Sequence, residues 1–580
     1  MESFCAWLRP ALLTRDTHRI GVAVRYPQTF IRALELNADD ARQVSERITS
    51  WTLSASGWRG VVASHEEDDS PTIDGTSALI SAAAAYVFAG FVNSRKAVRN
   101  LTDYARAHDP TRVLIACDSR PTGPAILQAV FNVLIGEGAE PVMLGMVPIC
   151  EALAASAADP GVDGLVYVSA SHNPVGYNGF KLSAGDGKVL EAKAASELSE
   201  QLRQLALSPE ALMRIWGPAS GVSEKLRRNT LAEGDRLHSQ SRTHYQKLCE
   251  DAVFGTRTEA QTSLRRAIKA DGLGLLIDFN GSARAASIDV EWFKSLQLRV
   301  ETINNRAGHI AHRIVPEGRS LEQLSTALLE AYGKDQRFQL GYMPDCDGDR
   351  GTIVYVDDRA SEPTVREIGA QEIFALCCLA AIRTLSEPDR ARCALAVNGP
   401  TSLRINRLAD AFGSAVFRAE VGEANVVALA SQLAAQGYVV PILGEGSNGG
   451  NITPPSGVRD PLHSVTAVLS LLRPSPGHSE SISDLLASLP PFVTTPAYED
   501  RAGLRITQQD HHKVKSAFEA LFPSAWEDIR EEMNTKYGVS SFEFRQFCGT
   551  QTFIGPGRVD ASNDRTGGLA VYLLDSDSRD

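Results

Sequence analysis

A unit made of an apolar run, a small-residue loop and an amphipathic stretch occurs three times along this chain of 580 residues. The apolar runs RVLIAC, LGLLI and CALAV begin at Arg112, Leu273 and Cys393. Each is followed by a loop, by a stretch with helical periodicity and by a second apolar run. This order predicts a strand, a helix and a parallel strand, with helices on both faces of the sheet. The sequence therefore predicts an α/β protein with three related βαβ-type domains and mixed sheets.

Changes in composition along the chain indicate where the domains begin and end. Residues 1–49 are expected to form an N-terminal extension, and the Pro/Ser-rich stretch at 472–483 is typical of a hinge. Beyond this stretch, the runs SFEFRQF and LAVYLLD predict strands of a smaller α+β domain, which looks truncated at its C-terminal end. The expected domains cover residues 50–240, 241–357, 358–475 and 490–580.

Composition and charge exclude several classes of protein. Hydrophobic residues make up 43% and charged residues 22%, which excludes a mainly disordered, collagen-like or coiled-coil chain. The 58 Lys and Arg against 70 Asp and Glu give a net charge of −12. This charge argues against nonspecific binding to nucleic acid or to an anionic membrane. A local cluster of Arg and Lys could still bind an anionic substrate.

Cysteine usage and apolar stretches bear on localisation. The nine cysteines, an odd number without a C-x-x-C pattern, are typical of a reduced intracellular protein. The Ala-rich stretch at 78–92 is too short to span a bilayer and predicts a buried helix. The N-terminal residues lack the features of a signal peptide. We expect a cytoplasmic monomer or homodimer with no nucleic-acid or membrane partner.

The segment DCDGDR lies between two apolar runs and is expected to be a loop between strands. Its carboxylates at Asp345, Asp347 and Asp349 can converge on one hard cation. An EF-hand is excluded, since Arg350 and Val356 stand where that loop needs Gly and Glu. A solvated acidic turn is the alternative. Arg350 beside three aspartates favours a site that holds a divalent cation and an anion together.

The segment SASHNP follows the apolar run GLVYV and is expected to be a loop at a strand end. Ser171 could act there as a nucleophile or phosphate carrier, with His172 beside it. Lys181, ten residues further on, could add positive charge to the same pocket. The serine-hydrolase elbow G-x-S-x-G is absent, and an ordinary Ser/Asn/Pro turn is the alternative.

Two further loops contain polar residues among glycines. GEGSNGG offers the Glu445 carboxylate and the Ser447 hydroxyl, a combination that suits a ligand with several hydroxyl groups. It is neither a Walker A motif nor a G-x-G-x-x-G motif. SGWRG places Arg59 between glycines that let the backbone bend around an anion. An ordinary turn without a ligand is the alternative.

Taken together and in chain order, SGWRG, SASHNP, DCDGDR and GEGSNGG resemble the four motifs of the phosphohexomutase superfamily, the phosphoglucomutases and phosphomannomutases. The resemblance covers roughly residues 50–475. It implies a phosphoserine domain, a metal-binding domain and a sugar-binding domain in this order, followed by the C-terminal domain.

The resemblance also implies roles for individual residues. Ser171 would be the phosphoserine, and it would complete the coordination of Mg²⁺ by the three aspartates of DCDGDR. The other implied positions are Arg350 beside the metal, His172 in the phosphoserine loop, Arg59 and Lys181 around the phosphoryl group, Glu445 and Ser447 on sugar hydroxyls, and Asp118 and Arg120 in support of the first domain.

By resemblance, the expected activity is the interconversion of the 1- and 6-phosphates of glucose or mannose. Phospho-Ser171 would donate its phosphoryl group to a sugar monophosphate and recover one from the resulting hexose 1,6-bisphosphate, which would also serve as the phosphorylating activator. The transfer needs a central cleft that closes and excludes water. Alternatives are a catalytically weak paralogue that binds sugar phosphates, and an amino-sugar or pentose phosphomutase.

The sequence departs from the family pattern at three places. Gly449 stands where the sugar loop usually ends in His, and Glu423 stands where a basic residue is usual. The last-domain motif R-x-S-G-T-E-P, which holds the phosphate that is not reacting, does not occur in the chain. We therefore expect a high KM and suspect a C-terminal truncation. The basic residues near the end follow no family spacing: Arg545, Arg558, Arg565 and Arg579.

Overall fold

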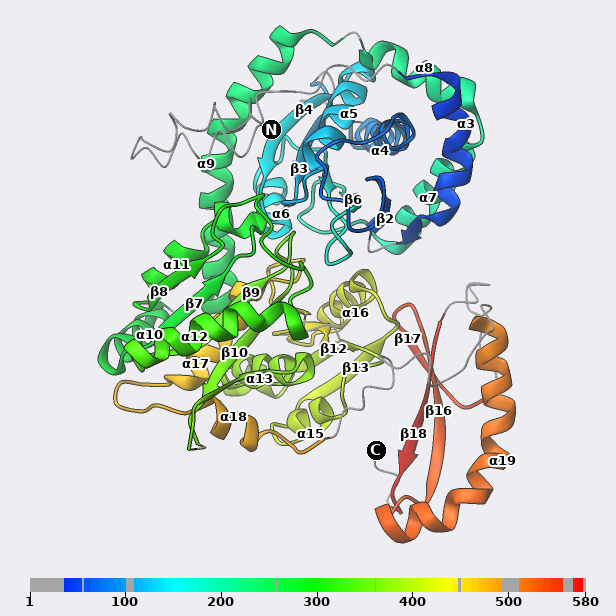
Figure 1. Cartoon of the computed structure of the whole chain (residues 1–580). Helices are drawn as coiled ribbons and strands as arrows, with labels where there is room; N and C mark the ends of the chain where they lie inside the picture. The colour runs from blue at the N-terminus through cyan, green and yellow to red at the C-terminus, as the bar shows by residue number, and fades with distance from the viewer. Residues whose placement is uncertain are drawn as a thin grey trace. The chain divides into compact units, whose positions relative to one another are not determined.

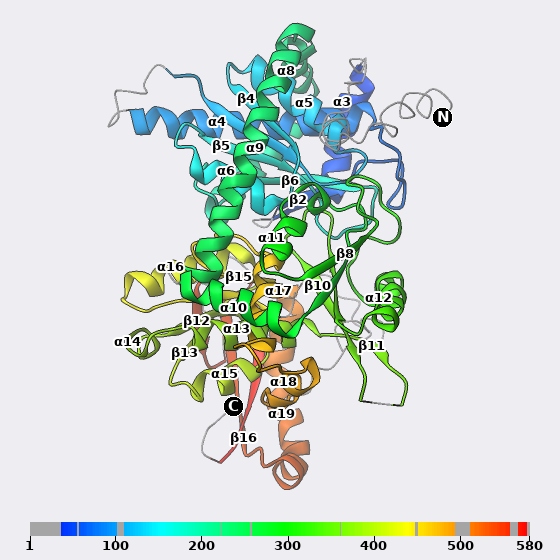
Figure 2. The same cartoon turned by 90° about the vertical axis from the view of Figure 1, so that its left-hand side faces the viewer.

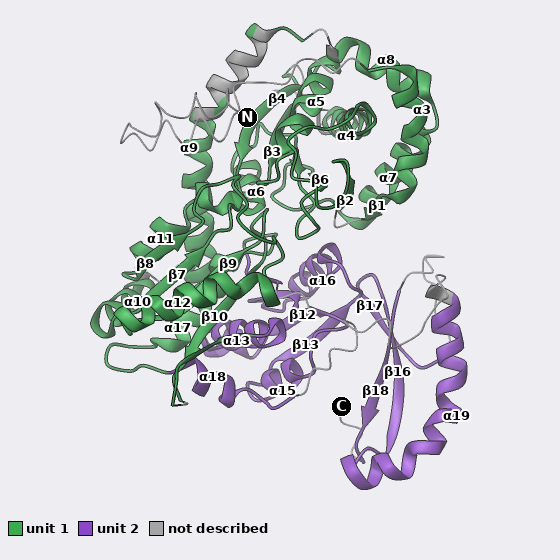
Figure 3. Ribbon diagram, in the orientation of Figure 1, with its two compact units in different colours: residues 1–368, 455–480 green, residues 369–454, 481–580 purple. Residues whose placement is uncertain are grey.

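The computed structural model of the chain (Figures 1 and 2) describes residues 36–54, 57–100, 109–220, 222–255, 258–359, 361–446, 450–492, 511–556 and 567–576. The chain forms two compact units, drawn in green and purple in Figure 3. The first unit comprises Met1–Ile368 and Pro455–Glu480, and the second comprises Gly369–Pro454 and Ser481–Asp580. Each unit has its own sheets and its own apolar core.

The first unit begins with a six-stranded mixed sheet in the order β1-β2-β6-β5-β3-β4. The strand β3 is parallel to β4 and β5, whereas β5, β6, β2 and β1 are joined in antiparallel pairs. The predicted first βαβ unit is present as β3, α5 and β4. The strands are β1 Thr52–Ser54, β2 Gly57–Val61, β3 Arg112–Cys117, β4 Glu140–Met146, β5 Gly164–Val168 and β6 Tyr177–Ser183.

Apolar helices cover this sheet because their buried faces are built from small and branched apolar residues. Asn37 caps α3 by accepting from the backbone N–H groups of Asp39 and Asp40, and Ala41 and Val44 of this helix join the same core. Residues just before position 49 are therefore part of the first unit. The helices are α3 Ala38–Arg47, α4 Gly75–Asn100, α5 Gly123–Gly136, α6 Ile149–Ala158, α7 Ala192–Ala206 and α8 Pro209–Ser220.

The Ala-rich stretch predicted as a buried helix is the middle of α4. The helix is longer than expected, with 26 residues. By length and composition alone, its segment Gly75–Val98 could cross a membrane, but 78% of the apolar window is buried inside the unit. A core helix of a soluble protein has the same properties, so the burial agrees with the prediction.

A second mixed sheet of the first unit has the order β11-β10-β9-β7-β8. The strand β7 is parallel to β8 and β9, and β9, β10 and β11 are antiparallel neighbours. The predicted second βαβ unit is present as β7, α11 and β8. The strands are β7 Gly274–Asp278, β8 Arg299–Ile303, β9 Phe338–Pro344, β10 Gly351–Asp357 and β11 Thr364–Glu367, and the helices are α10 Thr258–Asp271, α11 Asp289–Ser295 and α12 Glu322–Lys334.

Helix α9, Glu224–Phe254, is the long element of the first unit in Figure 2. It packs on α6 and β4 of the first sheet and on α17, Pro461–Leu472. The residues of α17 were expected in the third repeated domain, but they lie in the first unit. The reason is that α17 is buried there on nearly all sides, with Trp292 donating to the Thr466 hydroxyl. The other expected domain boundaries stay a prediction.

The second unit contains a four-stranded sheet in the order β13-β12-β14-β15 and a three-stranded antiparallel sheet in the order β17-β16-β18. The predicted third βαβ unit is present as β12, α15 and β13. The elements are α13 Ala370–Arg383, α14 Glu387–Arg390, β12 Ala394–Asn398, α15 Arg404–Asp410, β13 Ala415–Ala419, α16 Glu423–Ala435, β14 Leu443–Glu445, β15 Gly450–Ile452, α18 Ile482–Ser488, α19 His511–Tyr537, β16 Ser541–Cys548, β17 Gln551–Ile554 and β18 Gly568–Leu574.

Candidate functional site

The predicted acidic loop connects the antiparallel strands β9 and β10 of the first unit. Gly348 allows the tight turn, because its φ is +70° and an added Cβ would lie 2.6 Å from Cγ of Arg284. The Gly348 N–H donates to Asp345 Oδ1 at 3.0 Å. Carboxylate oxygens of Asp345, Asp347 and Asp349 lie within 4.8 Å of one another, and all three residues are buried. The alternative of a solvated acidic turn is therefore wrong.

Ser171 lies in the loop that follows β5, and its backbone has a φ of +54°. This left-handed conformation is uncommon for residues other than glycine. It is held because the Ser171 N–H donates to Oγ of Ser169 at 2.8 Å. The guanidinium of Arg120 also holds the loop, by donating to the carbonyl oxygens of Ser171 at 2.6 Å and Asn173 at 2.5 Å. Arg120 thus supports the loop as the resemblance implied.

Asp118 follows β3 and helps to orient the same loop. Its carboxylate accepts from Nε of Arg120 at 3.2 Å and from the Ser169 hydroxyl at 2.8 Å. Burial, opposed by the nearby Arg120 charge and reinforced by Asp347, raises the pKa of Asp118 to about 6. Carboxylate, guanidinium and hydroxyl therefore form one buried network behind Ser171.

The Ser171 loop and the acidic loop meet inside the first unit. Oγ of Ser171 lies 3.4 Å from Oδ2 of Asp345, and Oγ of Ser169 lies 3.2 Å from Oδ2 of Asp347. The Ile149 N–H, at the start of α6, donates to the Asp347 carbonyl at 3.0 Å. The fold thus places two motifs side by side, although their residues Ser171 and Asp345 are more than 170 positions apart in the sequence.

Basic side chains surround the three carboxylates. Nζ of Lys181, on β6, lies 2.6 Å from Oδ2 of Asp347 and 2.7 Å from Oδ2 of Asp349. Arg459 donates to the same oxygen of Asp349 at 2.7 Å, and Nε of Arg350 lies 3.8 Å from its Oδ1. The predicted positions Lys181 and Arg350 are therefore at the acidic loop.

Arg59 belongs to β2, the strand that pairs with β6, and it stands opposite Gly179 in the register. Its charge interacts with those of Arg350, Arg459 and the aspartates, and burial with Arg350 lowers the pKa of its guanidinium. Lys181 is two residues beyond Gly179, so Arg59 and Lys181 lie on the same face of the sheet. Arg59 and Lys181, which the resemblance implied around a phosphoryl group, therefore face the same side of this sheet.

The charges shift the acid strengths of the aspartates in opposite directions. Burial, together with the charges of Asp347 and Asp349, raises the pKa of Asp345 well above its ordinary value. Burial also opposes the ionisation of Asp349, but Arg459, Lys181 and Arg350 outweigh it and hold that pKa below its ordinary value. The loop is therefore built to keep Asp349 charged, and Asp345 would ionise readily only with another positive charge beside it.

The carboxylate oxygens also show where a cation fits. Oδ1 of Asp347 and Oδ1 of Asp349 are buried and have no hydrogen-bond partner among the described residues. Buried oxygens of this kind are costly unless a cation or water satisfies them. Three clustered carboxylates, two of them with an unpartnered oxygen, are a suitable donor set for a hard divalent cation.

His172 lies beside the phosphate-carrying position. Its Nδ1 is 3.4 Å from Oγ of Ser171. Burial and the positive charge of Arg350 lower the pKa of His172 to about 4, so the ring is neutral at neutral pH. A neutral imidazole at this distance can exchange a proton with the Ser171 hydroxyl.

Glu445 lies at the end of β14 in the second unit. Its Oε1 accepts from Nδ2 of Asn398 at 3.0 Å and from the Gly422 N–H at 2.8 Å. Glu423, the expected departure from the family, is buried in the first turn of α16, where a negative charge suits the helix dipole. Ser447 and Gly449 lie outside the described residues, so the role of the whole sugar loop stays a prediction.

Arg459 is the residue at the acidic loop that the sequence analysis did not identify. It precedes Asp460, the N-cap of α17, and its carbonyl accepts from the Cys150 thiol at 3.1 Å. An Arg before a helix cap carries no recognisable motif, and only the fold brings it to a loop 110 positions away. Near the C-terminus, Arg545 lies over the ring of Tyr572 and pairs with Glu543, whereas Arg558, Arg565 and Arg579 lie outside the described residues.

Comparison with known proteins gives a match that contains the Ser171 loop. Residues 91–208 match the sequence profile described as phosphoglucomutase/phosphomannomutase, alpha/beta/alpha domain I. The predicted resemblance to the phosphohexomutases is confirmed. The matched stretch includes Lys181 and the β3–α5–β4 unit as well as Ser171.

Curated relatives of this chain include phosphoglucosamine mutases. The phosphoglucosamine mutase of Sorangium cellulosum is 26% identical over 319 residues, which cover 54% of this chain and 57% of the relative. The phosphoglucosamine mutase of Clostridium beijerinckii is 36% identical over 99 residues, which cover 17% of this chain and 21% of the relative. The chain thus spans about half the length of the first relative and about a fifth of the second.

Solved structures share the fold. The phosphoglucomutase pp63/parafusin of Paramecium, in its open form, has a TM-score of 0.55 at 14% identity, covering 86% of this chain and 82% of that chain. A phosphoglucomutase/phosphomannomutase family protein of Burkholderia thailandensis has a TM-score of 0.50 at 19% identity, covering 77% of this chain and 80% of that chain. These similarities confirm the predicted fold class, an α/β protein with mixed sheets and several domains.

Proposed function

We propose that this chain is a phosphohexomutase that interconverts hexose 1-phosphate and hexose 6-phosphate through a phosphoserine at Ser171. The observation that carries the proposal is the meeting of the Ser171 hydroxyl with three buried aspartates and a ring of basic side chains in the first unit. A hydroxyl, a cation site and surplus positive charge are what phosphoryl transfer requires.

The residues divide the work as follows. In the first transfer, the bond between phosphorus and Oγ of Ser171 breaks while a sugar hydroxyl oxygen bonds to phosphorus, giving a hexose bisphosphate. In the second, the other phosphoryl group returns to Oγ and the monophosphate isomer leaves. Lys181, Arg459 and Arg59 offset the charge of the phosphoryl group. The proton that the sugar hydroxyl loses in the first transfer passes through His172 to Oγ, and it returns by the same route in the second, since the ring is neutral and 3.4 Å from Oγ.

Asp345, Asp347 and Asp349 would hold a Mg²⁺ ion, with an oxygen of the phosphoserine as a further ligand. The unpartnered oxygens of Asp347 and Asp349 support this assignment. When bound, Mg²⁺ supplies charge stabilisation to the transferring phosphoryl group. It also supplies the positive charge that lets Asp345 ionise.

For the sugar, we propose glucose or mannose, as the motifs imply, with glucosamine as the second candidate. The second candidate is favoured by the curated relatives, because both of those named above are phosphoglucosamine mutases. Glu445 is proposed to accept hydrogen bonds from sugar hydroxyls, and Ser447 to assist it. We also propose a reducing, cytoplasmic location, since the nine cysteines of the chain are an odd number without a C-x-x-C pattern.

The deciding experiment is phosphorylation of the full chain with glucose 1,6-bisphosphate, followed by mass spectrometry of its peptides. We expect phosphate on Ser171 and turnover of at least one of glucose 1-phosphate, mannose 1-phosphate and glucosamine 1-phosphate. Ser171→Ala should abolish both. The matched control is Ser156→Ala, which removes another buried hydroxyl, one without a hydrogen-bond partner among the described residues.

The competing function is a catalytically weak paralogue that only binds sugar phosphates. Its support is the absence of R-x-S-G-T-E-P from the chain. Bisphosphate binding by calorimetry, without phosphate on Ser171 and without turnover of any of the three sugars, would establish that function and overturn the mutase.

A further inference from the structure

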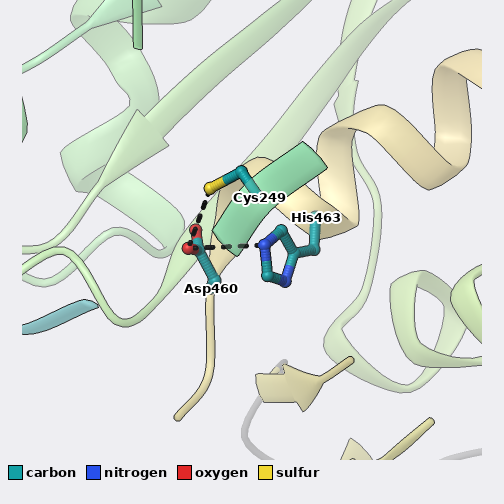
Figure 4. Close-up of side chains that lie close together, drawn as sticks. All are labelled: Cys249, Asp460 and His463. Atoms are coloured by element: carbon teal, nitrogen blue, oxygen red, sulfur yellow. Dashed lines mark hydrogen bonds and ion pairs between the residues drawn. The ribbon is translucent and has the colours of Figure 1, made fainter. Parts of the chain in front are cut away.

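A second cluster of metal-ligating side chains lies in the first unit and contains none of the residues of the acidic loop. Cys249 of α9, Asp460 at the start of α17 and His463 one turn later offer a sulfur, a carboxylate oxygen and a ring nitrogen within 4.8 Å of one another (Figure 4). All three residues are buried, and their relative exposures are 0%, 1% and 2%. The proposed mutase reaction makes no use of them.

His463 provides the observation that sets this cluster apart from ordinary core polar residues. Neither of its ring nitrogens has a hydrogen-bond partner among the described residues, although the side chain is almost completely buried. Its Nε2 lies 3.7 Å from Oδ2 of Asp460, which is too long for a hydrogen bond. A buried imidazole without partners is costly, and a metal ion bound at a ring nitrogen would remove that cost.

Asp460 is oriented in the way that metal-binding carboxylates usually are. Its Oδ1 accepts from Nη2 of Arg284 at 2.6 Å and from the Leu462 N–H at 2.9 Å. Its Oδ2 faces the other side and lies 4.0 Å from Sγ of Cys249. Arg284 therefore fixes Oδ1, and the Tyr245 hydroxyl, which donates to Oδ2 at 2.6 Å, holds that oxygen on the side of the thiol and the imidazole. Such supporting contacts orient metal ligands.

We propose that Cys249, Asp460 and His463 bind a structural zinc ion. Thiolate, imidazole and carboxylate are the ligands that zinc prefers, whereas Mg²⁺ prefers oxygen alone. Tetrahedral zinc ligands lie about 3.3 to 3.6 Å apart, so the present separations of 3.7 and 4.0 Å need only small shifts. The carboxylates of Asp460 and Asp289 and the Cys249 thiolate together balance the ion and the buried Arg284 guanidinium, which pairs with both carboxylates. A water would complete the set, because the Tyr245 hydroxyl already donates to Oδ2 of Asp460 at 2.6 Å, closer than two ligands of one zinc ion can lie.

The proposed ion would fasten α9 to α17, which are more than 200 positions apart in sequence. It would also hold the residue after Arg459, whose guanidinium contacts Asp349 of the acidic loop. The site is closed and buried, as structural zinc sites are, so we expect the metal to enter during folding.

The test is to produce the full chain with cobalt in place of zinc and to record its absorption. A cobalt–thiolate bond gives a near-ultraviolet charge-transfer band that carboxylates cannot produce, so the acidic loop does not interfere. We expect the band in the wild type, and about one zinc per chain by elemental analysis when zinc is supplied. Cys249→Ser should lose the band, and His463→Gln should lose most of the bound metal.

Two controls complete the design. Cys378→Ser changes another buried free cysteine in the second unit, and Asp347→Asn changes the acidic loop; neither should affect the band. A wild type without the band and without zinc that survives dialysis overturns the proposal. So does a band that persists in Cys249→Ser. If that variant does not fold, the wild-type spectrum and His463→Gln decide. These readouts are independent of mutase activity.

Discussion

Carboxylates lie at strand ends in both units, but the groups that contact them differ in charge. In the first unit, Asp347 and Asp349 face the ammonium of Lys181 and the guanidinium of Arg459. In the second unit, Glu445 accepts from two neutral donors, an amide side chain and a backbone N–H. The first arrangement suits a phosphoryl group with its metal, and the second suits hydroxyl groups. The difference predicts that changes in the first unit alter kcat and that changes at Glu445 alter KM.

The largest effect should follow Asp347→Asn. This variant keeps the shape of the side chain but removes a charge from the proposed cation site, so we expect kcat to fall by about 100-fold or more, with a higher Mg²⁺ requirement. Steady-state assays over a range of Mg²⁺ measure both effects. Asp186→Asn, at an exposed position of the first unit, is the control and should behave as the wild type. Full activity of Asp347→Asn, or of the wild type in a chelator, would contradict the metal role.

Arg459→Gln should have the next largest effect. It removes one charge-assisted hydrogen bond to Asp349, of about 1.5 to 3 kcal/mol, so we expect kcat/KM to fall by about 10- to 100-fold. Arg459→Lys should recover part of the loss, because the positive charge is restored without the second donor. Arg337→Gln, on the surface, is the control. Equal activities of Arg459→Gln and the control would show that the missed residue is only structural.

A smaller effect is expected for Glu445→Gln in the second unit. The amide can still accept one hydrogen bond from a sugar hydroxyl, so about 1 kcal/mol of binding should be lost and KM should rise about 5- to 10-fold. The kcat should change less than the KM. The exposed Glu387→Gln is the control. If kcat collapses while KM is unchanged, the comparison between the two units is wrong.

Much of the first site could be predicted from the sequence because its residues belong to contiguous loops. Each of Ser171, Lys181 and Asp347 stands in or near a motif whose residue types state their chemistry. Arg459 could not be found in this way, because it reaches Asp349 only through the packing of α17 in the first unit. Ser169 belongs to the motif SASHNP, but its hydrogen bond to the Ser171 N–H depends on the left-handed backbone at Ser171.

The fold shows the same division between local and long-range information. Alternation of apolar runs and amphipathic stretches predicted the three βαβ units, because strand and helix periodicities are local. The boundary near residue 475 could not be read from local signals. Helix α17 follows the sugar-loop region in sequence, yet Trp292 and Tyr245 hold its residues in the first unit.

The smallest effect concerns the pH dependence of His172 in the first unit. Burial and Arg350 lower its folded pKa to about 4, against about 6.5 in an unfolded chain. The unfolded state therefore binds the proton more readily. The resulting stabilisation is fully present above pH 6.5, and up to about 3 kcal/mol is lost as the pH falls to 4.

His172→Asn should remove this contribution. In Mg²⁺-free, unphosphorylated protein, we expect the unfolding free energy of the variant to change less between pH 6.5 and 4 than that of the wild type. Urea unfolding at several pH values measures the difference, and ring resonances in NMR give the titration midpoint directly. The control is His309→Asn, because His309 lies outside the loop that contains His172. A His172 resonance that titrates near pH 6.5 would mean that burial and Arg350 do not act on this ring, and the role given to the cations of the first unit would lose one of its supports.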